Sequence, residues 1–494
     1  MYKVFYTNID HFGGMDTSDW TQPPEEETTL ESTPVGLVGG SLILLVSLLI
    51  LVIGSFVYQI STTILLMTVS IVTTSVYVFY YDFSWEKMLR YGAAPLVGRI
   101  TNVLLILMLI GALIGIWMIS GTIPYLMYVG IQVLSPEFFL VSTALIVSVG
   151  ALVTGTSFGS GATFGVALIG VAQGLGVPLP QTAGAVVMGA FFGDKLSPLS
   201  DTTVLAAGVS ETDLFDHIRS MLYTTIPGYV IGLAVFLVVG LQYGGSAEPE
   251  NITAMTQALQ EAFSLSPLLL VPPIVLLVLS YRQYSTVPVL WIAILTAIPL
   301  AIYQGYDVTE IAGAMAAGPE VSTDVDTLNE LVTRGGIESM TNIITVLIFA
   351  FLFAGQLEYT QTIGVIAESI RERFVRDDSG RLIFVTSLTS ILGTLTTGAV
   401  QLSLIIPPIM FSKIYDRLEI DRTVLSRTIE DSGTVTAPIV PWNLAGLYFA
   451  GILGVPTLAY APWTFICYLG PLFAWLYGFT DTFVFKTDDH PDTQ

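Results

Sequence analysis

The stretch GLVGGSLILLVSLLILVIGSFVY, residues 36–58, carries no charged side chain and no alternation of apolar and polar positions. In a bilayer only helices and closed barrels satisfy their backbone hydrogen bonds, and about 20 apolar residues form a helix that spans the hydrocarbon. Barrel strands alternate in polarity, so an unbroken apolar run favours a helix. The stretch therefore predicts a transmembrane helix.

Comparable apolar stretches follow along the whole chain. Hydrophobic residues make up 53% of the 494 positions and charged residues only 11%, against about 25% charged residues in soluble domains. This composition excludes a soluble protein and predicts an all-α polytopic protein of the cell membrane, with roughly 11–13 membrane segments and the lipid bilayer as a partner. The predicted segments are 36–57, 60–81, 100–120, 137–176, 183–208, 220–242, 264–281, 286–304, 339–358, 382–412, 428–452 and 459–480.

Polar stretches at the ends and between the segments predict the domain organisation. The acidic start of the chain lacks the basic end and short apolar core of a signal peptide, and we expect it to be disordered. The predicted parts are a tail at 1–34, a first membrane repeat at 35–242, an acidic loop at 243–263, a second repeat at 264–480 with an acidic loop at 305–338, and a tail at 481–494.

The charge of the chain is strongly negative, with a net value of -22, and the carboxylates gather in the tails and loops. Such a surface suits salt-rich surroundings and predicts a halophilic archaeal source. The alternative is that acidic loops gather cations near an entrance. The lone Cys467 lies in an apolar run, which excludes a disulfide within the chain.

The two halves of the chain repeat one another. Transporters built from repeats place their substrate site near the bilayer midplane, where the repeats meet. The duplication therefore indicates a transporter. The matching stretches are ITNV (100–103) with MTNI (340–343), the Thr-Ile pairs at 122–123 and 362–363, TGTSFGSGAT (154–163) with GTLTTGA (393–399), and Asp194 with Asp431.

Two of the segments, 137–176 and 382–412, are too long for one span, and their middles are rich in Gly, Ser and Thr. Each predicts a pair of half-helices around an unwound centre. Basic loop residues predict cytoplasmic termini and halves of inverted orientation. Lys413, Arg417, Arg422 and Arg427 do not fit this topology.

The most informative motif is GAFFGDKLSPLSDTTVLAAG, residues 189–208, which places Asp194, Lys195 and Asp201 between apolar flanks. Ionisable residues at membrane depth cost several kcal/mol and usually mark an ion path. Pro198 interrupts the helix, so carbonyl and hydroxyl oxygens become available to a hard cation. The alternative is a loop at the membrane surface. The second half disfavours this alternative, because EDSGTVTAPIVPWN (430–443) repeats the order of acid, hydroxyls and proline.

These motifs and the broken segments supply the candidate site residues. In the broken segments, close helix packing explains the small residues equally well. Glu358, at the end of an apolar run, is either a second proton carrier or a helix cap. The candidates for proton and sodium binding are Asp194, Asp201, Asp431, Ser197, Ser200, Thr202, Thr203, Thr154, Thr156, Ser157, Ser432, Thr434, Thr436 and Asn443, with Lys195 compensating their charge and Thr394, Thr396, Thr397 and Glu358 as secondary candidates.

Enzyme motifs are missing from the sequence. His11, His217 and His490 are placed in tails or loops, and no HExxH, P-loop or Ser-His-Asp pattern occurs. We therefore expect no enzymatic activity, no cofactor and no nucleic-acid partner. Transport is expected to be driven by ion gradients.

The stretches TGTSFG, FGDKLSPLSDTT and SGTVTAPIVPWN resemble motifs of the NhaC family of sodium/proton antiporters, within the ion-transporter superfamily, and the hydropathy match covers residues 35–480. Phe158 departs from the expected Trp, and Ser160-Gly161 replaces a common Thr. The resemblance implies exchange of Na⁺ for H⁺, two inverted repeats with broken helices and hairpins, and a homodimer with an elevator-like movement.

Several alternatives remain open at this point. Relatives of this family include exchangers that couple sodium and protons to malate and lactate, so a small organic anion or Li⁺ is a further possible cargo. A passive cation channel, a receptor and a lipid-binding membrane protein are the alternatives from other classes. For an antiporter, the expected mechanism is competition: burial favours the neutral form of a carboxyl group and a bound cation favours the charged form.

Overall fold

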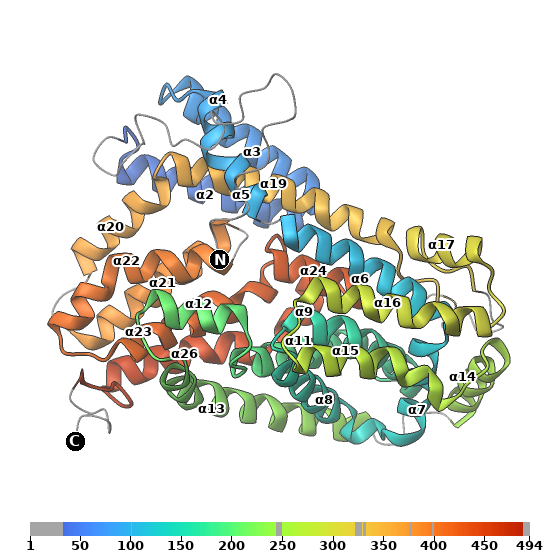
Figure 1. The fold of residues 1–494 in the computed structure, drawn as a ribbon. Helices are drawn as coiled ribbons and strands as arrows, with labels where there is room; N and C mark the ends of the chain where they lie inside the picture. Colours follow the sequence, from blue (N-terminus) through green and yellow to red (C-terminus); the bar gives the residue numbers. More distant parts are fainter. Residues whose placement is uncertain are drawn as a thin grey trace.

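The computed structural model describes residues 33–99, 101–243, 249–321, 329, 332–374, 378–397 and 400–487, and nearly all regular structure in these ranges is helical. The one exception there is an isolated β-bridge between Ile420 and Lys486. The predicted disordered tail falls almost entirely outside the described residues. Figure 1 shows the helices in chain order from blue to red.

The first half contains α2 (Leu37–Phe56), α3 (Thr62–Phe79), α4 (Trp85–Lys87), the π-helix η1 (Met88–Ala93), α5 (Ala94–Arg99), α6 (Thr101–Ile119), α7 (Thr122–Val133), η2 (Pro136–Phe138), α8 (Phe139–Thr154), α9 (Ser157–Ser160), the π-helix η3 (Gly161–Gly165), α10 (Val166–Leu175), α11 (Leu179–Lys195), α12 (Asp201–Val209), α13 (Leu214–Gly240) and η4 (Leu241–Tyr243).

The second half contains α14 (Pro249–Ala262), η5 (Pro267–Leu270), α15 (Val271–Tyr281), α16 (Thr286–Tyr303), α17 (Val308–Ala316), η6 (Ile337–Met340), α19 (Thr341–Tyr359), α20 (Thr362–Phe374), α21 (Ser379–Thr397), α22 (Val400–Arg417), α23 (Arg422–Ile429), the π-helix η7 (Glu430–Thr434), η8 (Ala437–Ile439), α24 (Leu444–Leu453), α25 (Thr457–Tyr460), η9 (Ala461–Trp463) and α26 (Phe465–Thr480).

Length and apolar character support a polytopic membrane protein. Among the described residues, eight helices are long and apolar enough to cross a membrane, or up to ten if each of two bent pairs counts as one span. This confirms the all-α membrane fold. The stretches 243–263 and 305–338 are not simple loops, because they contain α14 and α17. Asp307 starts α17 with a capping box, which satisfies the first backbone amides.

The order of elements recurs between the halves. The helices α6 and α19 both have 19 residues, and they begin at the matching residues Thr101 and Thr341. Each is followed by a shorter helix, α7 or α20, that begins at a matching threonine. Each half also packs a helix against a helix of the other half: α3 packs on α19, and α16 packs on α6 (Figure 1). A twofold relation between the repeats predicts this mutual packing; their inverted orientation stays a prediction.

Each of the two long segments forms a hairpin of two helices, and in the first half both helices are longer than the predicted half-helices. In the first half, 136–154 and 157–175 are each 19 residues long and apolar enough to span a membrane. They meet at Gly155, which has a positive φ of 65°. In the second half, α21 and α22 pack along each other, and Ser390 Oγ donates to the Ser403 carbonyl at 2.7 Å. The half-helix prediction was wrong for the first half, and it stays a prediction for α21 and α22, which are not among the described helices apolar enough to span.

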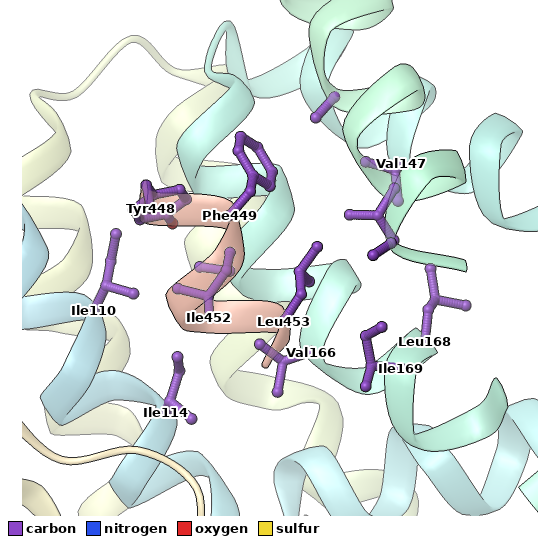
Figure 2. Close-up of a cluster of buried hydrophobic side chains, with 14 of the residues drawn as sticks. Ile110, Ile114, Val147, Val166, Leu168, Ile169, Tyr448, Phe449, Ile452 and Leu453 are labelled. Carbon is purple, nitrogen blue, oxygen red and sulfur yellow. The ribbon is translucent and has the colours of Figure 1, made fainter. Parts of the chain in front are cut away.

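Helix α24 ties the two halves together in the core. Figure 2 shows its side chains between α6 and the returning arm of the first hairpin. Phe449 and Leu453 are fully buried, and Ile110 of α6 and Ile169 of α10 belong to the same apolar cluster. Tyr448 also donates its hydroxyl hydrogen to the Phe158 carbonyl at 2.6 Å. This core holds the break at Gly155 against the second half.

Gly355→Ala is expected to destabilise the protein strongly. A Cβ atom at this position of α19 would lie 2.4 Å from the backbone of Ala93 in η1, a contact that requires the backbone to move. We expect poor yield and a lowered melting temperature in detergent. The control is Gly313→Ala in α17, where no atom lies within 4 Å of the added Cβ. Equal melting temperatures for the two variants would contradict this packing.

Candidate functional site

Helix α11 carries Asp194 and Lys195 to the centre of the molecule because small residues let it approach α8. A Cβ added at Gly189 or Gly193 would lie 2.4 Å or 2.2 Å from carbonyl oxygens of α8. One turn later, Ser197 Oγ donates to the Leu152 carbonyl at 2.9 Å. The contacting residues of α11 and α8 advance together in sequence number, so the two helices run parallel. The end of α11 is therefore placed beside the break at Gly155.

The chain between α11 and α12 forms a short polar turn. Helix α11 ends at Lys195, and Pro198 follows within the turn. Ser200 caps the start of α12 by accepting from the Thr203 amide at 3.4 Å, and Thr203 Oγ1 donates to the Lys195 carbonyl at 3.1 Å. These bonds hold the turn that the motif 189–208 predicts.

In the second half, the motif EDSGTVTAPIVPWN begins with the π-helix η7, which comprises its first five residues. The side chains of α21 hold η7: Ser387 Oγ and Ser432 Oγ lie 2.6 Å apart, and Thr394 Oγ1 donates to the Gly433 carbonyl at 2.8 Å. Short π-segments within helices occur often at functional sites, because they redirect side chains. Here the segment places Glu430 and Asp431 in the buried interior.

An ion pair joins the two halves. Lys195 Nζ donates to Asp431 Oδ1, and these side chains are 1% and 0% exposed. The pair links the end of α11 to η7. Asp431 is thus brought to the residue next to its matching acid Asp194, and the single ion site stays a prediction.

Among the described residues, two buried carboxyl groups of this cluster form no ion pair, although Lys195 interacts electrostatically with one of them, Glu430. Asp194 is 4% exposed and Glu430 is fully buried. Among the described residues, none donates a hydrogen bond to Asp194 Oδ1, to either carboxylate oxygen of Glu430, or to Asp431 Oδ2. Ser157 and Ser200 interact with Asp194, and Thr202 and Thr434 interact with Glu430. Glu430 and Asp194 also interact with each other electrostatically.

Sequence reasoning missed Glu430, Arg427 and His217. Glu430 directly precedes the matched Asp431, and the rule applied to Asp194, an ionisable residue at membrane depth, would have found it. Arg427 is 1% exposed and donates to the Phe483 and Ser220 carbonyls at 3.0 Å and 3.5 Å. His217 was placed in a loop but is fully buried in α13, with Nδ1 2.7 Å from Ser426 Oγ.

A cavity of about 570 Å³ borders Asp201 and the hairpin break. Thr154, Gly155 and Thr156 of the hairpin break line it, together with Asp201 and Tyr448. Asp201 is exposed at the start of α12, unlike the buried acids, and it interacts with Asp194. Asp201 therefore lies at the rim of the candidate site, between the cavity and Asp194.

Many of the predicted hydroxyl ligands are bound to backbone in this state. Asn443 Oδ1 accepts from the Ala445 amide and caps α24, and its amide group donates to the Thr394 carbonyl at 3.1 Å. Glu358 lies in the last turn of α19, which packs on α3 and η1. The side chain of Thr397 is outside the described residues. Hydroxyls that donate to backbone carbonyls are those of Thr154, Ser197, Thr203, Thr394, Thr396 and Thr436.

The chemistry of this cluster suits a small hard cation. Within the described ranges, no three His, Cys, Asp or Glu side chains lie together as a metal cluster. A bound sodium ion therefore needs hydroxyl or carbonyl oxygens beside one or two carboxylates, and the hydroxyl of Thr434 is buried with no bonding partner among the described groups. An all-helical membrane protein with such acids where two repeats meet defines the class of ion-coupled secondary transporters.

Comparison with known proteins identifies the family. The model of the Na⁺/H⁺ antiporter family matches residues 189–482. The chain is 36% identical over 452 residues to the Na⁺/H⁺ antiporter NhaC of Alkalihalophilus pseudofirmus, which is 90% of this chain and 95% of that protein. The chain therefore belongs to the Na⁺/H⁺ antiporter family, and the resemblance to NhaC is confirmed.

Two other relatives carry different names. The malate-2H⁺/Na⁺-lactate antiporter of Bacillus subtilis is 39% identical over 388 residues, covering 78% of this chain and 82% of its own length. The arginine/ornithine antiporter ArcD of Halobacterium salinarum is 36% identical over 412 residues, covering 83% of this chain and 84% of its own length. All three relatives are antiporters by name, which supports exchange as the mode of transport.

Proposed function

We propose that this protein exchanges sodium for protons across the cell membrane by competition at the buried acids around Lys195. The observation that carries the proposal is Asp194, a buried carboxyl group with an unbonded oxygen beside the ion pair that joins the repeats. Burying an unpaired carboxylate is unfavourable, so the group binds a proton or a cation. One ion displaces the other, and this enforces exchange.

Access to the acids passes through the cavity at Asp201. Cations reach this cavity from one side of the membrane, and Asp201 attracts them. Ser157 and Ser200 beside Asp194 supply neutral oxygens for a partly dehydrated ion. A change of exposure then requires movement of α11 and α12 together with η7, because the Lys195–Asp431 pair connects them. The proposed movement is elevator-like, within a homodimer of two inverted-repeat protomers whose termini are cytoplasmic.

Exchange of a small organic solute is the second candidate function. The cavity is far larger than a sodium ion requires and falls within the size range of small-molecule sites. Asp201 is the one charged side chain among the described residues that line it, beside polar groups such as Gln401 and Asn102. This lining favours a solute with a cationic group over a free dicarboxylate, since Lys195 is already paired with Asp431.

A proteoliposome experiment tests both candidates. Purified protein is reconstituted with a pH-sensitive dye inside, and an inward sodium gradient is imposed. We expect internal alkalinisation that depends on Na⁺ and is absent with choline. Malate, lactate, arginine and ornithine are then added singly. A pH trace that does not respond to sodium would overturn the exchange proposal, and a response only in the presence of one solute would establish the second candidate.

A further inference from the structure

The adjacent acids Glu430 and Asp431 have different surroundings. Asp431 is bound to Lys195, whereas no described basic side chain pairs with Glu430. Glu430 interacts electrostatically with Lys195 and Asp194 without forming an ion pair, and Thr202 and Thr434 lie beside it. Successive residues of a helix point in different directions, so the neighbouring acids in η7 face different groups. The same helical segment therefore presents one paired and one unpaired acid.

The buried acidic and basic side chains of the cluster do not balance in charge. Lys195 and Asp431 neutralise each other across the contact between the halves. Arg427 lies one turn before Asp431, interacts with it electrostatically and donates to two backbone carbonyls. The three buried acids Asp194, Glu430 and Asp431 therefore face two buried bases, and the negative charge that remains is stable only with a cation or a proton. The buried oxygens of this region that make no hydrogen bond with the described residues are Asp194 Oδ1, Asp431 Oδ2, both Glu430 oxygens and Thr434 Oγ1, and each can accept a cation.

We propose that Glu430 is a direct ligand of the transported cation, together with Asp194 and Thr434, while Asp431 is the lasting partner of Lys195. This inference rests on the proposed exchange function and divides its site into two parts. One part is a pair of carboxylates, contributed by both repeats, that holds the cargo. The other is a neutral ion pair that connects α11 to η7.

The donor set defines the class of cargo. Two carboxylates and a hydroxyl are hard oxygen ligands, and they suit alkali cations such as Na⁺ and Li⁺. Because the two carboxylates come from different repeats, a bound cation also bridges the repeats. Occupancy is therefore expected to stabilise the folded protein.

The test measures sodium dependence in Glu430→Gln, which keeps the size of the side chain and removes its charge. We expect the sodium concentration for half-maximal exchange to rise about tenfold or more, as loss of a metal ligand or its support does elsewhere. Glu430→Asp is expected to recover part of the affinity. The control is Glu86→Gln on α4, an exposed position, with unchanged sodium dependence.

A binding measurement separates ligand loss from failure of transport. In detergent, NaCl is expected to raise the melting temperature of the wild type above that in choline chloride of equal concentration, and Glu430→Gln is expected to lose this increase. If Glu430→Gln does not fold, Thr434→Val and Glu430→Asp are measured instead. Wild-type sodium dependence in the folded variants would overturn the inference, whereas a wild type with no sodium-driven proton movement would overturn the proposed function itself.

Discussion

Asp194→Asn is expected to abolish sodium-driven proton movement while the protein stays folded. The carboxyl group is 4% exposed, and it lies beside the only buried ion pair described between the repeats. Asparagine keeps the shape of the side chain but carries no negative charge and releases no proton at working pH. The variant can therefore bind neither the sodium ion nor the proton at this position. Exchange is measured in proteoliposomes as the sodium-dependent change of internal pH.

The matched control for this variant is Asp307→Asn. Asp307 is an exposed N-cap of α17, and asparagine is equally good at an N-cap, so neither folding nor exchange is expected to change. Size-exclusion profiles and melting temperatures of both variants establish that they are folded. If Asp194→Asn exchanged sodium for protons at the wild-type rate, Asp194 would not be part of the ion path.

Breaking the buried pair from one side is expected to destabilise the protein more than removing both partners. Asp431→Asn leaves the Lys195 ammonium buried without its carboxylate, and Lys195→Met leaves the Asp431 carboxylate buried without its ammonium. Leaving one charge of a buried pair unmatched typically costs about 3–5 kcal/mol, whereas replacing both charges by uncharged groups is often close to neutral. The double variant K195M/D431N is therefore expected to be more stable than either single variant.

The measurement for this cycle is the free energy of unfolding, or the melting temperature, of the four proteins in one detergent. The control is Asp416→Asn, which breaks the bidentate pair with Arg422 on the surface and is expected to cost about 1 kcal/mol or less. Additive losses in the double variant would show that the two side chains act independently. That result would contradict the pair as the link between α11 and η7.

Much of the fold could be predicted because the local composition of the sequence indicates which segments lie in the membrane. The segments predicted from apolar runs, such as 36–57, 100–120 and 286–304, match α2, α6 and α16 closely. Elements with fewer apolar residues escaped, as α7, α14 and α20 did, since amphipathic and short helices lack a distinctive apolar run. The helix boundaries of the repeat were also predictable from the matching threonines that begin α6 and α19.

The candidate site was predicted in part. The acids Asp194 and Asp431 were paired from sequence by the repeat, and they lie in one cluster. Glu430 was missed because the two halves were compared only at residues that match. The position that corresponds to Glu430 in the first half is Gly193. Asp201 looked equivalent to Asp194 in sequence, but the start of α12 places it at the cavity. Neighbouring letters of a motif do not show which side chain faces which group.

The sequence alone determined that this chain is an α-helical membrane protein with two related halves and ionisable residues at membrane depth. These properties follow from local composition, and bilayer hydrocarbon imposes them on each segment separately. Only the tertiary structure decided that Lys195 pairs with Asp431 across the halves, while Glu430 and Asp194 form no ion pair within the described residues. Pairing is a property of residues that lie more than 200 positions apart, and it depends on how closely the glycines of α11 let its backbone approach α8.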